Sequence, residues 1–198
     1  MIRKPVLAAA QLGIGLLLAV SALALYFNYL RFMYELTFMS NFLAGLFFLT
    51  AGALTLAGRR VPQILYLCFT VLLILVMGTC LAFMGNFSFS GSFLFLHLIN
   101  PLVVTLYFVL ACDMREVPIK LTPAAVLMPA AYLLFALIFG AATGNYIYFF
   151  LDYGQVGTAF TAVFILAAAA ALLLVSLLLW LGNRLLRGAG AGKGRIEE

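Results

Sequence analysis

The chain has 198 residues, of which 67% are hydrophobic and only 9% are charged, and its mean hydropathy is +1.21. A soluble domain carries about 25% charged residues, so this composition excludes an ordinary soluble globular protein. Eleven basic residues against six acidic ones give a net charge of +5. The basic residues are scattered over the ends of connections and form no basic stripe, which argues against a nucleic-acid partner.

Six apolar runs account for most of the chain, and each approaches or exceeds the roughly 20 residues that a helix needs to cross a bilayer. They cover residues 6–27, 37–57, 62–84, 93–112, 123–141 and 156–181. We therefore predict an all-α membrane protein, a bundle of six transmembrane helices. The predicted transmembrane domain covers residues 1–187, and residues 188–198 are predicted to be a flexible cytoplasmic tail.

The distribution of lysine and arginine predicts the orientation of the bundle. Ten of the 11 basic residues fall on one side, and Arg31 alone falls on the other. Because cytoplasmic connections carry an excess of lysine and arginine, both termini are predicted to be cytoplasmic. The short loops fit a multi-pass protein of a bacterial inner (plasma) membrane. The first run is longer than the roughly 7–15 residues of a signal-peptide core, which favours a membrane anchor over a cleaved signal peptide.

The apolar runs contain no Asp, Glu, Lys or Arg, which disfavours ion pumps, proton-coupled carriers and voltage sensors. Cys68, Cys80 and Cys112 lack metal-ligand spacing and are interpreted as small buried hydrophobic residues. Motifs for nucleotides and metals are missing too, so we expect no cofactor and no metal. Before the fifth run, Thr122 and Pro123 are predicted to be the N-cap and first residue of a helix.

Two polar stripes interrupt the apolar pattern near the predicted outer face. Thr37, Ser40 and Asn41 open the second run, and their spacing of three and four residues places them on one helical face. In the fourth run His97, the one histidine of the chain, shares a face in the same way with Asn100 and Pro101. Proline has no N–H, so Pro101 leaves the carbonyl of His97 without its helical partner.

Thr37 and His97 each lie about one turn inside the outer end of a helix that enters from the same side, so they are predicted to meet in the bundle. A hydroxyl beside an imidazole is a candidate nucleophile and general base. Thr37 also lies in the first turn of its helix, where unpaired N–H groups and the positive end of the dipole favour an oxyanion. The simpler interpretation is that these polar residues only bind neighbouring helices.

Further polar residues are candidates for supporting roles. Ser40, Asn41 and Asn100 are predicted to donate hydrogen bonds to the oxyanion or to orient the pair. Asp152, in the third outer connection, is the candidate carboxylate that orients the imidazole, and Glu35 competes for that role.

The segment Leu36-Thr37-Phe38, with a polar residue at Ser40, resembles the second-helix motif of the androgen-induced-gene and androgen-dependent tissue-factor-pathway-inhibitor-regulating family. His97 followed by Pro101 is similar to the family's His-x-x-x-Pro segment. Thr37, Ser40, Asn41, His97 and the aromatic connection that reaches Asp152 also resemble the family's bacterial relatives. The animal members are multipass threonine hydrolases that cleave fatty acid esters of hydroxy fatty acids.

This resemblance implies a six-helix fold with Thr37 and His97 as the essential pair. It implies no role for Asp152, and Asn41 and Asn100 are not part of the animal motif. We expect an intramembrane hydrolase of lipid (fatty acyl) esters at the outer face, whose substrate enters from the membrane. The alternatives are a protein that binds or transports a lipid or small amphiphile without turnover, and a structural membrane component.

Overall fold

The computed structural model describes residues 4–83 and 91–193, and within these ranges it consists of helices and connections with no β-strand. The long α-helices are α1 (Lys4–Tyr26), α2 (Leu36–Leu56), α3 (Gln63–Phe83), α5 (Asn100–Ala111), α6 (Leu127–Thr143) and α8 (Thr158–Lys193). The short elements are η1 (Leu30–Phe32), α4 (Gly91–Leu94), η2 (Phe95–Ile99), η3 (Met114–Glu116), η4 (Ile119–Val126), η5 (Phe149–Leu151) and α7 (Tyr153–Val156). The predicted all-helical class is confirmed.

Five helical segments are long and apolar enough to cross a membrane: α1, α2, α3, the continuous segment Ile119–Thr143 and α8. The sixth predicted helix is built from α4, η2 and α5, and its apolar part, Phe95–Ala111, is shorter. The structure therefore supports five to six membrane-spanning helices. Residue 84, which ends the third predicted run, and residues 194–198 of the predicted tail lie outside the described residues.

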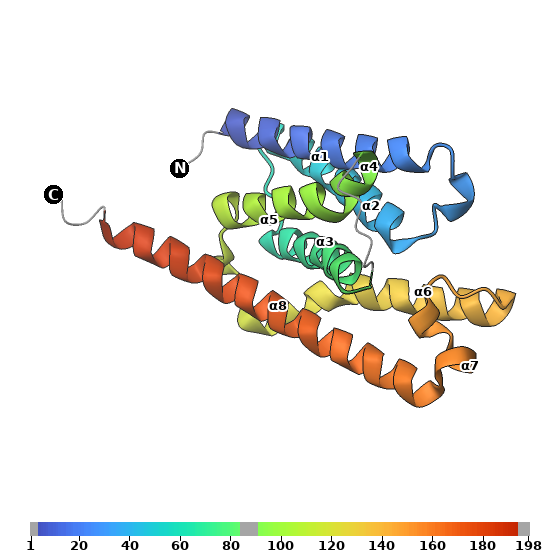
Figure 1. Cartoon of the computed structure of the whole chain (residues 1–198). Helices are drawn as coiled ribbons and strands as arrows, with labels where there is room; N and C mark the ends of the chain where they lie inside the picture. Colours follow the sequence, from blue (N-terminus) through green and yellow to red (C-terminus); the bar gives the residue numbers. More distant parts are fainter. Residues whose placement is uncertain (1–3, 84–90, 194–198) are drawn as a thin grey trace.

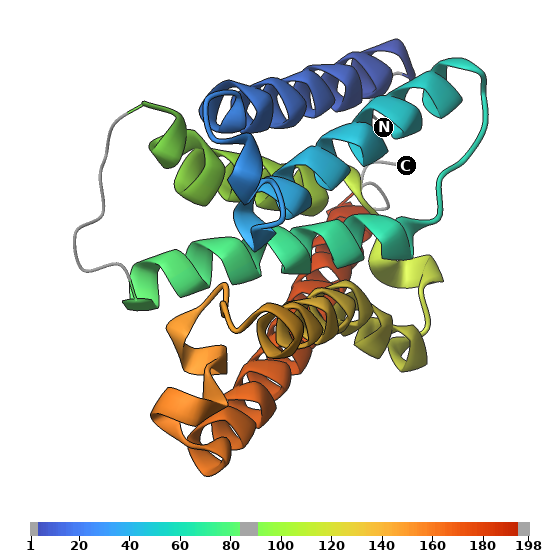
Figure 2. The same ribbon diagram turned by 90° about the vertical axis from the view of Figure 1, so that its right-hand side faces the viewer.

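The helices form a bundle in which α1 and α2 lie side by side, α3 and α5 occupy the middle, and α6 and α8 complete the opposite side (Figures 1 and 2). The helix α3 supplies much of the core, including the fully buried Leu67, Val71 and Leu73. The first and last described residues, Lys4 and Lys193, lie at one end of the bundle, and the connections after α1 and α6 lie at the other (Figure 1).

The antiparallel helices α1 and α2 approach each other closely because glycines face each other across their interface. A Cβ atom on Gly15 would lie 2.7 Å from the backbone nitrogen of Leu49, and one on Gly45 would lie 2.8 Å from that of Ala19. Small residues allow this kind of backbone contact between helices in membranes. The helix predicted as an anchor is therefore packed into the bundle.

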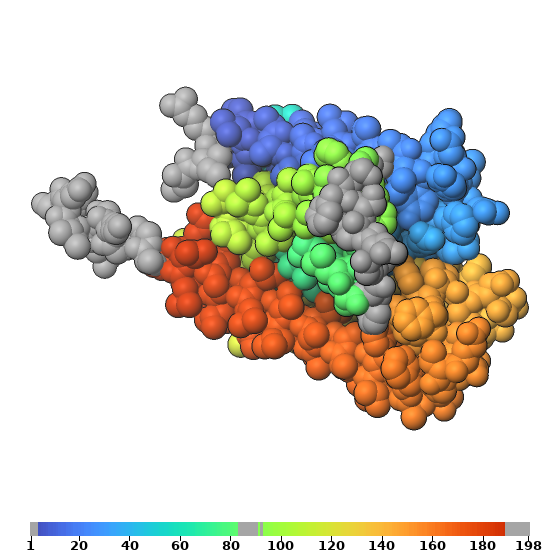
Figure 3. Space-filling model, viewed as in Figure 1, coloured from blue at the N-terminus to red at the C-terminus, as the bar shows by residue number. Residues whose placement is uncertain are grey.

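The long helix α8 crosses the bundle obliquely and covers the lower side of the molecule in Figure 3. With 36 residues it extends about 54 Å. Most of its large apolar side chains are exposed, as on a lipid-facing helix. It continues to Lys193, beyond the boundary predicted at residue 187. Asn183 joins it to the end of α5, because its amide nitrogen donates to the carbonyls of Phe108 and Cys112, both at 3.1 Å.

The predicted start of the fifth helix is wrong. The segment begins at Ile119 as the 3₁₀-helix η4, with Pro118 as its N-cap and Pro123 in its interior. The Thr122 hydroxyl donates to the carbonyl of Ile119 at 2.9 Å, so it does not cap a new helix. The spacing of residues does not predict the 3₁₀ start at Ile119, because 3₁₀ turns and the first turns of α-helices have similar amino-acid composition.

Candidate active site

Thr37 lies in the first turn of α2, at the end of the bundle away from both termini. The helix begins at Leu36, and Glu35 precedes it with extended backbone angles (φ −66°, ψ 146°). The N–H of Leu36 donates to the hydroxyl of Tyr148, in the connection after α6, at 3.3 Å. Burial raises the pKa of Tyr148, so this phenol stays protonated at neutral pH. The first turn of α2 is thus tied to a distant segment of the chain.

His97 lies in η2, a short π-helical turn between α4 and α5. The N–H of Asn100 donates to the carbonyl of Phe95, five residues earlier, instead of to the carbonyl four residues earlier. Pro101 has no N–H to offer to the His97 carbonyl, so the ordinary helical ladder is broken here. Single π turns within α-helices are frequent at functional sites.

The structure brings Thr37 and His97 together, as their matching depth predicts. Oγ1 of Thr37 lies 3.2 Å from Nε2 of His97, and the imidazole is only 5% exposed. Nδ1 of His97 lies 3.0 Å from the carbonyl oxygen of Phe93. A carbonyl only accepts hydrogen bonds, so Nδ1 carries the proton and Nε2 of the neutral ring is left to accept from Thr37. This is the arrangement that a general base requires.

The ring of Phe93 also packs against the imidazole, with ring centroids 4.1 Å apart and planes inclined at 32°. One residue therefore orients His97 through both its carbonyl and its side chain. The carbonyl of Phe93 is the hydrogen-bond partner of His97 for which the sequence predicts a carboxylate. Sequence reasoning missed Phe93 because any residue type supplies a backbone carbonyl.

Asn41 and Asn100 are both fully buried and connect α2 to the His97 segment. Nδ2 of Asn41 donates to the carbonyls of Thr37 at 2.8 Å and Leu96 at 3.2 Å. Nδ2 of Asn100 donates to Oδ1 of Asn41 at 2.8 Å and to the hydroxyl of Ser21 at 2.9 Å. An amide nitrogen has two hydrogens, and both are used in each case. The asparagines therefore position the two helices and have no N–H left for an oxyanion.

Ser40 is buried on the same face, and its hydroxyl turns back to its own helix. It donates to the carbonyl of Leu36 at 2.5 Å and lies 3.3 Å from that of Thr37. Its one hydrogen is thus engaged, and an oxyanion donor must come from elsewhere. The backbone N–H groups of Thr37 and Phe38, in the first turn of α2, have no acceptor within the helix and are the best candidates.

The two acidic candidates occupy different positions. Asp152 caps the short helix α7, where its Oδ1 accepts from the N–H of Gln155 at 3.2 Å, and no described hydrogen bond joins it to His97. Glu35 lies closer to the pair, because its Oε2 accepts from the hydroxyl of Tyr26 at 2.6 Å and Tyr26 also interacts with the side chain of Thr37. Tyr26 is a neighbour of the site that sequence reasoning missed, because it ends α1 and resembles an ordinary interfacial tyrosine.

An apolar cavity of about 200 Å³ extends between α3, α6 and α8. Leu36, the residue before Thr37, forms part of its wall together with Tyr148. Its lining also includes Pro129, Phe164 and Leu172. The arrangement therefore places a hydroxyl beside a neutral imidazole, and the residue before that threonine lines an apolar cavity.

The helices and their exposed apolar surfaces are consistent with a multi-pass membrane protein. Comparison of the chain with protein-family models, with curated proteins and with solved structures gave no match.

Proposed function

We propose that the protein is a membrane-embedded hydrolase of fatty acyl esters, with Thr37 as nucleophile and His97 as general base. The observation that carries the proposal is the 3.2 Å contact between the Thr37 hydroxyl and Nε2 of a histidine whose other nitrogen is bonded to a carbonyl. This contact supplies both the geometry and the tautomer that proton abstraction requires.

In the proposed reaction Oγ1 of Thr37 attacks the acyl carbonyl carbon while Nε2 of His97 takes the hydroxyl proton. The tetrahedral oxyanion faces the N–H groups of the first turn of α2. The C–O bond to the alcohol then breaks, and His97 returns the proton to the leaving oxygen. Water next attacks the acyl-threonine with His97 again as base, which releases the fatty acid and restores the Thr37 hydroxyl.

The surroundings of the pair support an amphiphilic substrate. The apolar cavity that begins at Leu36 suits an acyl chain, and the pair itself lies near a helix end, where an ester group meets water. We propose that this end faces outward, with both termini in the cytoplasm of a bacterial cell, because lysine and arginine gather at the other end. The resemblance of the Leu36-Thr37-Phe38 and His97…Pro101 segments to transmembrane threonine hydrolases favours the same chemistry.

A second function, binding of a lipid or small amphiphile without turnover, is favoured by one observation. The hydrogens of Ser40, Asn41 and Asn100 are all engaged, so stabilisation of an oxyanion depends on the backbone alone. A site that only binds an apolar chain in the cavity needs no oxyanion donor.

Labelling with a fluorophosphonate, combined with an ester-hydrolysis assay, distinguishes the two functions. We expect the purified protein to form an adduct on Thr37 and to hydrolyse acyl esters, and Thr37→Ala to abolish both. Thr50→Ala is the matched control, because Thr50 lies on the same helix with its hydroxyl bonded to the carbonyl of Leu46. If the folded wild-type protein forms no adduct and hydrolyses no ester, the hydrolase proposal is wrong.

A further inference from the structure

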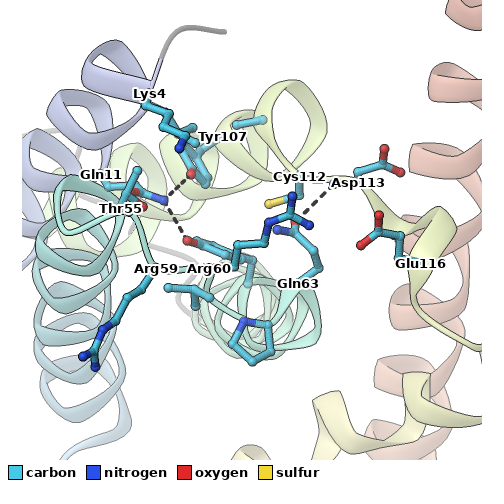
Figure 4. Close-up of a pocket in the computed structure, with 16 residues that line it drawn as sticks. Lys4, Gln11, Thr55, Arg59, Arg60, Gln63, Tyr107, Cys112, Asp113 and Glu116 are labelled. Carbon is cyan, nitrogen blue, oxygen red and sulfur yellow. Dashed lines mark hydrogen bonds between the residues drawn. The ribbon is translucent and has the colours of Figure 1, made fainter. Parts of the chain in front are cut away.

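A second, polar pocket lies at the opposite end of the bundle, where the start of α1 meets the connections after α2 and α5 (Figure 4). Its volume is about 510 Å³, and its lining includes residues from α1, α3, α5 and both connections. None of the residues proposed for hydrolysis lines it. The ester-hydrolase proposal therefore leaves this pocket unexplained.

The deep end of the pocket contains a buried amide with an unused acceptor. Gln11 is 1% exposed, and its Nε2 donates to the hydroxyls of Tyr66 at 2.7 Å and Tyr107 at 2.8 Å. Both contacts use the same amide atom, so Oε1 is left without a partner among the described residues. Buried polar atoms without a partner are rare and costly, and one that lines a pocket indicates that a ligand supplies the missing group.

The two tyrosines complete this polar group. Each hydroxyl accepts from Gln11, and the two hydroxyls also interact with each other, which uses one of their two O–H hydrogens. No hydrogen bond among the described residues uses the other O–H, and both tyrosines line the pocket. The deep end thus offers one acceptor, Oε1 of Gln11, beside one O–H donor. An alcohol is the complementary group, because it donates one hydrogen bond and accepts another through the same oxygen.

The mouth of the pocket is basic. Lys4, Arg59 and Arg60 line it, and in Figure 4 Lys4 and Arg60 extend over the pocket from opposite sides, whereas Arg59 points away. Two acidic residues, Asp113 and Glu116, also line it. Asp113 is neutralised by Arg115, which binds it at 2.6 Å and holds the pKa of the carboxyl below its usual value. The balance at the mouth is therefore positive and suits a phosphate group.

We propose that this pocket binds a phosphate ester that carries a free hydroxyl, with the phosphate between Lys4 and Arg60 and the hydroxyl at Gln11. Two sources share this chemistry: an anionic phospholipid whose headgroup has a hydroxyl, and a soluble hydroxylated phosphate ester. Basic pockets between transmembrane helices on the cytoplasmic side are known binding sites for phospholipid headgroups.

The test measures binding to the purified full-length protein by calorimetry and by the shift in unfolding temperature. The lipid arm compares phosphatidylglycerol, which has headgroup hydroxyls, with phosphatidic acid and phosphatidylcholine, which have none. The soluble arm compares glycerol 3-phosphate with inorganic phosphate. In at least one arm, we expect the compound with a hydroxyl to bind about tenfold more tightly than the compounds without one. The arm that shows this preference identifies whether the ligand is a phospholipid or a soluble phosphate ester.

Two variants with a matched control test the assigned contacts. Arg60→Gln is expected to weaken binding of every phosphate compound about tenfold, whereas Lys120→Gln leaves it unchanged because Lys120 is exposed and does not line the pocket. Gln11→Met is expected to abolish the preference for a hydroxyl and to retain phosphate binding. Equal binding of hydroxylated and non-hydroxylated compounds by the wild-type protein would overturn the proposal. Equal loss of binding in the Lys120 and Arg60 variants would also overturn it. Both residues are exposed, so this comparison tests the proposal even if Gln11→Met does not fold.

Discussion

The side-chain amide of Asn100 donates a hydrogen bond to Oδ1 of Asn41 over 2.8 Å, which joins the helix of Thr37 to the helix of His97. Asn41 in turn binds the carbonyls of Thr37 and Leu96, the residue before His97. The separation of Thr37 from His97 is thus controlled by two buried amides. This relationship explains why two asparagines are buried in a bundle built mainly from apolar side chains.

Replacement of Asn41 or Asn100 by alanine is expected to lower the free energy of unfolding. Each change leaves buried partners unsatisfied, at a cost of about 1–3 kcal/mol. Because the two side chains are bonded to each other, the double variant is expected to lose less than the two single losses combined. Unfolding in detergent by urea or heat measures all three variants. If the double variant lost as much unfolding free energy as the two single variants combined, the two amides would not be directly bonded.

His97→Gln is expected to reduce ester turnover by roughly 10²–10⁴-fold, the usual contribution of a general base. Glutamine keeps a polar group near Thr37 and cannot take up its proton, so substrate binding is expected to change little. Steady-state kinetics should therefore show a fall in kcat with a nearly constant KM. A variant with wild-type kcat would exclude His97 as the base.

Pro101→Ala is expected to restore an N–H that can pair with the carbonyl of His97, which favours an α-helical turn over the π-helical one. An α-helical turn has fewer residues than a π-helical turn, so this change would rotate the imidazole of His97 away from Thr37. A displacement of about 1 Å at a reacting group costs about 10²-fold in rate. The comparison is with Pro118→Ala, since Pro118 is exposed and precedes η4. Similar activity of the two variants would show that the π turn does not position His97.

Gly15→Ala is expected to destabilise the protein by about 1–3 kcal/mol, because the added methyl group meets backbone atoms of α2. The nearest backbone atoms are the nitrogen of Leu49 at 2.7 Å and the carbonyl oxygen of Gly45 at 2.9 Å. Gly13→Ala is the control on the same helix, since a Cβ there meets no atom within 4 Å. The shift in unfolding temperature of each variant measures the effect. Equal shifts would mean that α1 and α2 are not in close contact.

Much of the architecture follows from local patterns. The apolar runs predict the helices and their approximate bounds, because a membrane span depends on a continuous stretch of side chains. The same reasoning predicts that Thr37 and His97 lie at one depth, since both helices enter from one side. The start of the fifth helix was predicted wrongly, because Pro123 is compatible with both a 3₁₀ and an α-helical turn.

The supporting residues of the site were harder to predict. Spacing placed Asn41 and Asn100 on the correct faces, and it left open whether their amides face an oxyanion or a neighbouring carbonyl. It also favoured a carboxylate for His97, whereas the structure shows the carbonyl of Phe93. A buried polar side chain forms hydrogen bonds with whichever groups lie within reach, and the packing of the helices determines which groups those are.

The sequence by itself therefore determined the helical class, the apolar spans and the shared depth of Thr37 and His97, because hydropathy and helical period are properties of neighbouring residues. Only the tertiary structure decided the tautomer of His97, the engagement of the asparagine amides and the existence of the two cavities. Gln11 illustrates the reason: its partners Tyr66 and Tyr107 lie 55 and 96 residues away along the chain. Contacts of that kind are set by which helices become neighbours, and no local pattern specifies that choice.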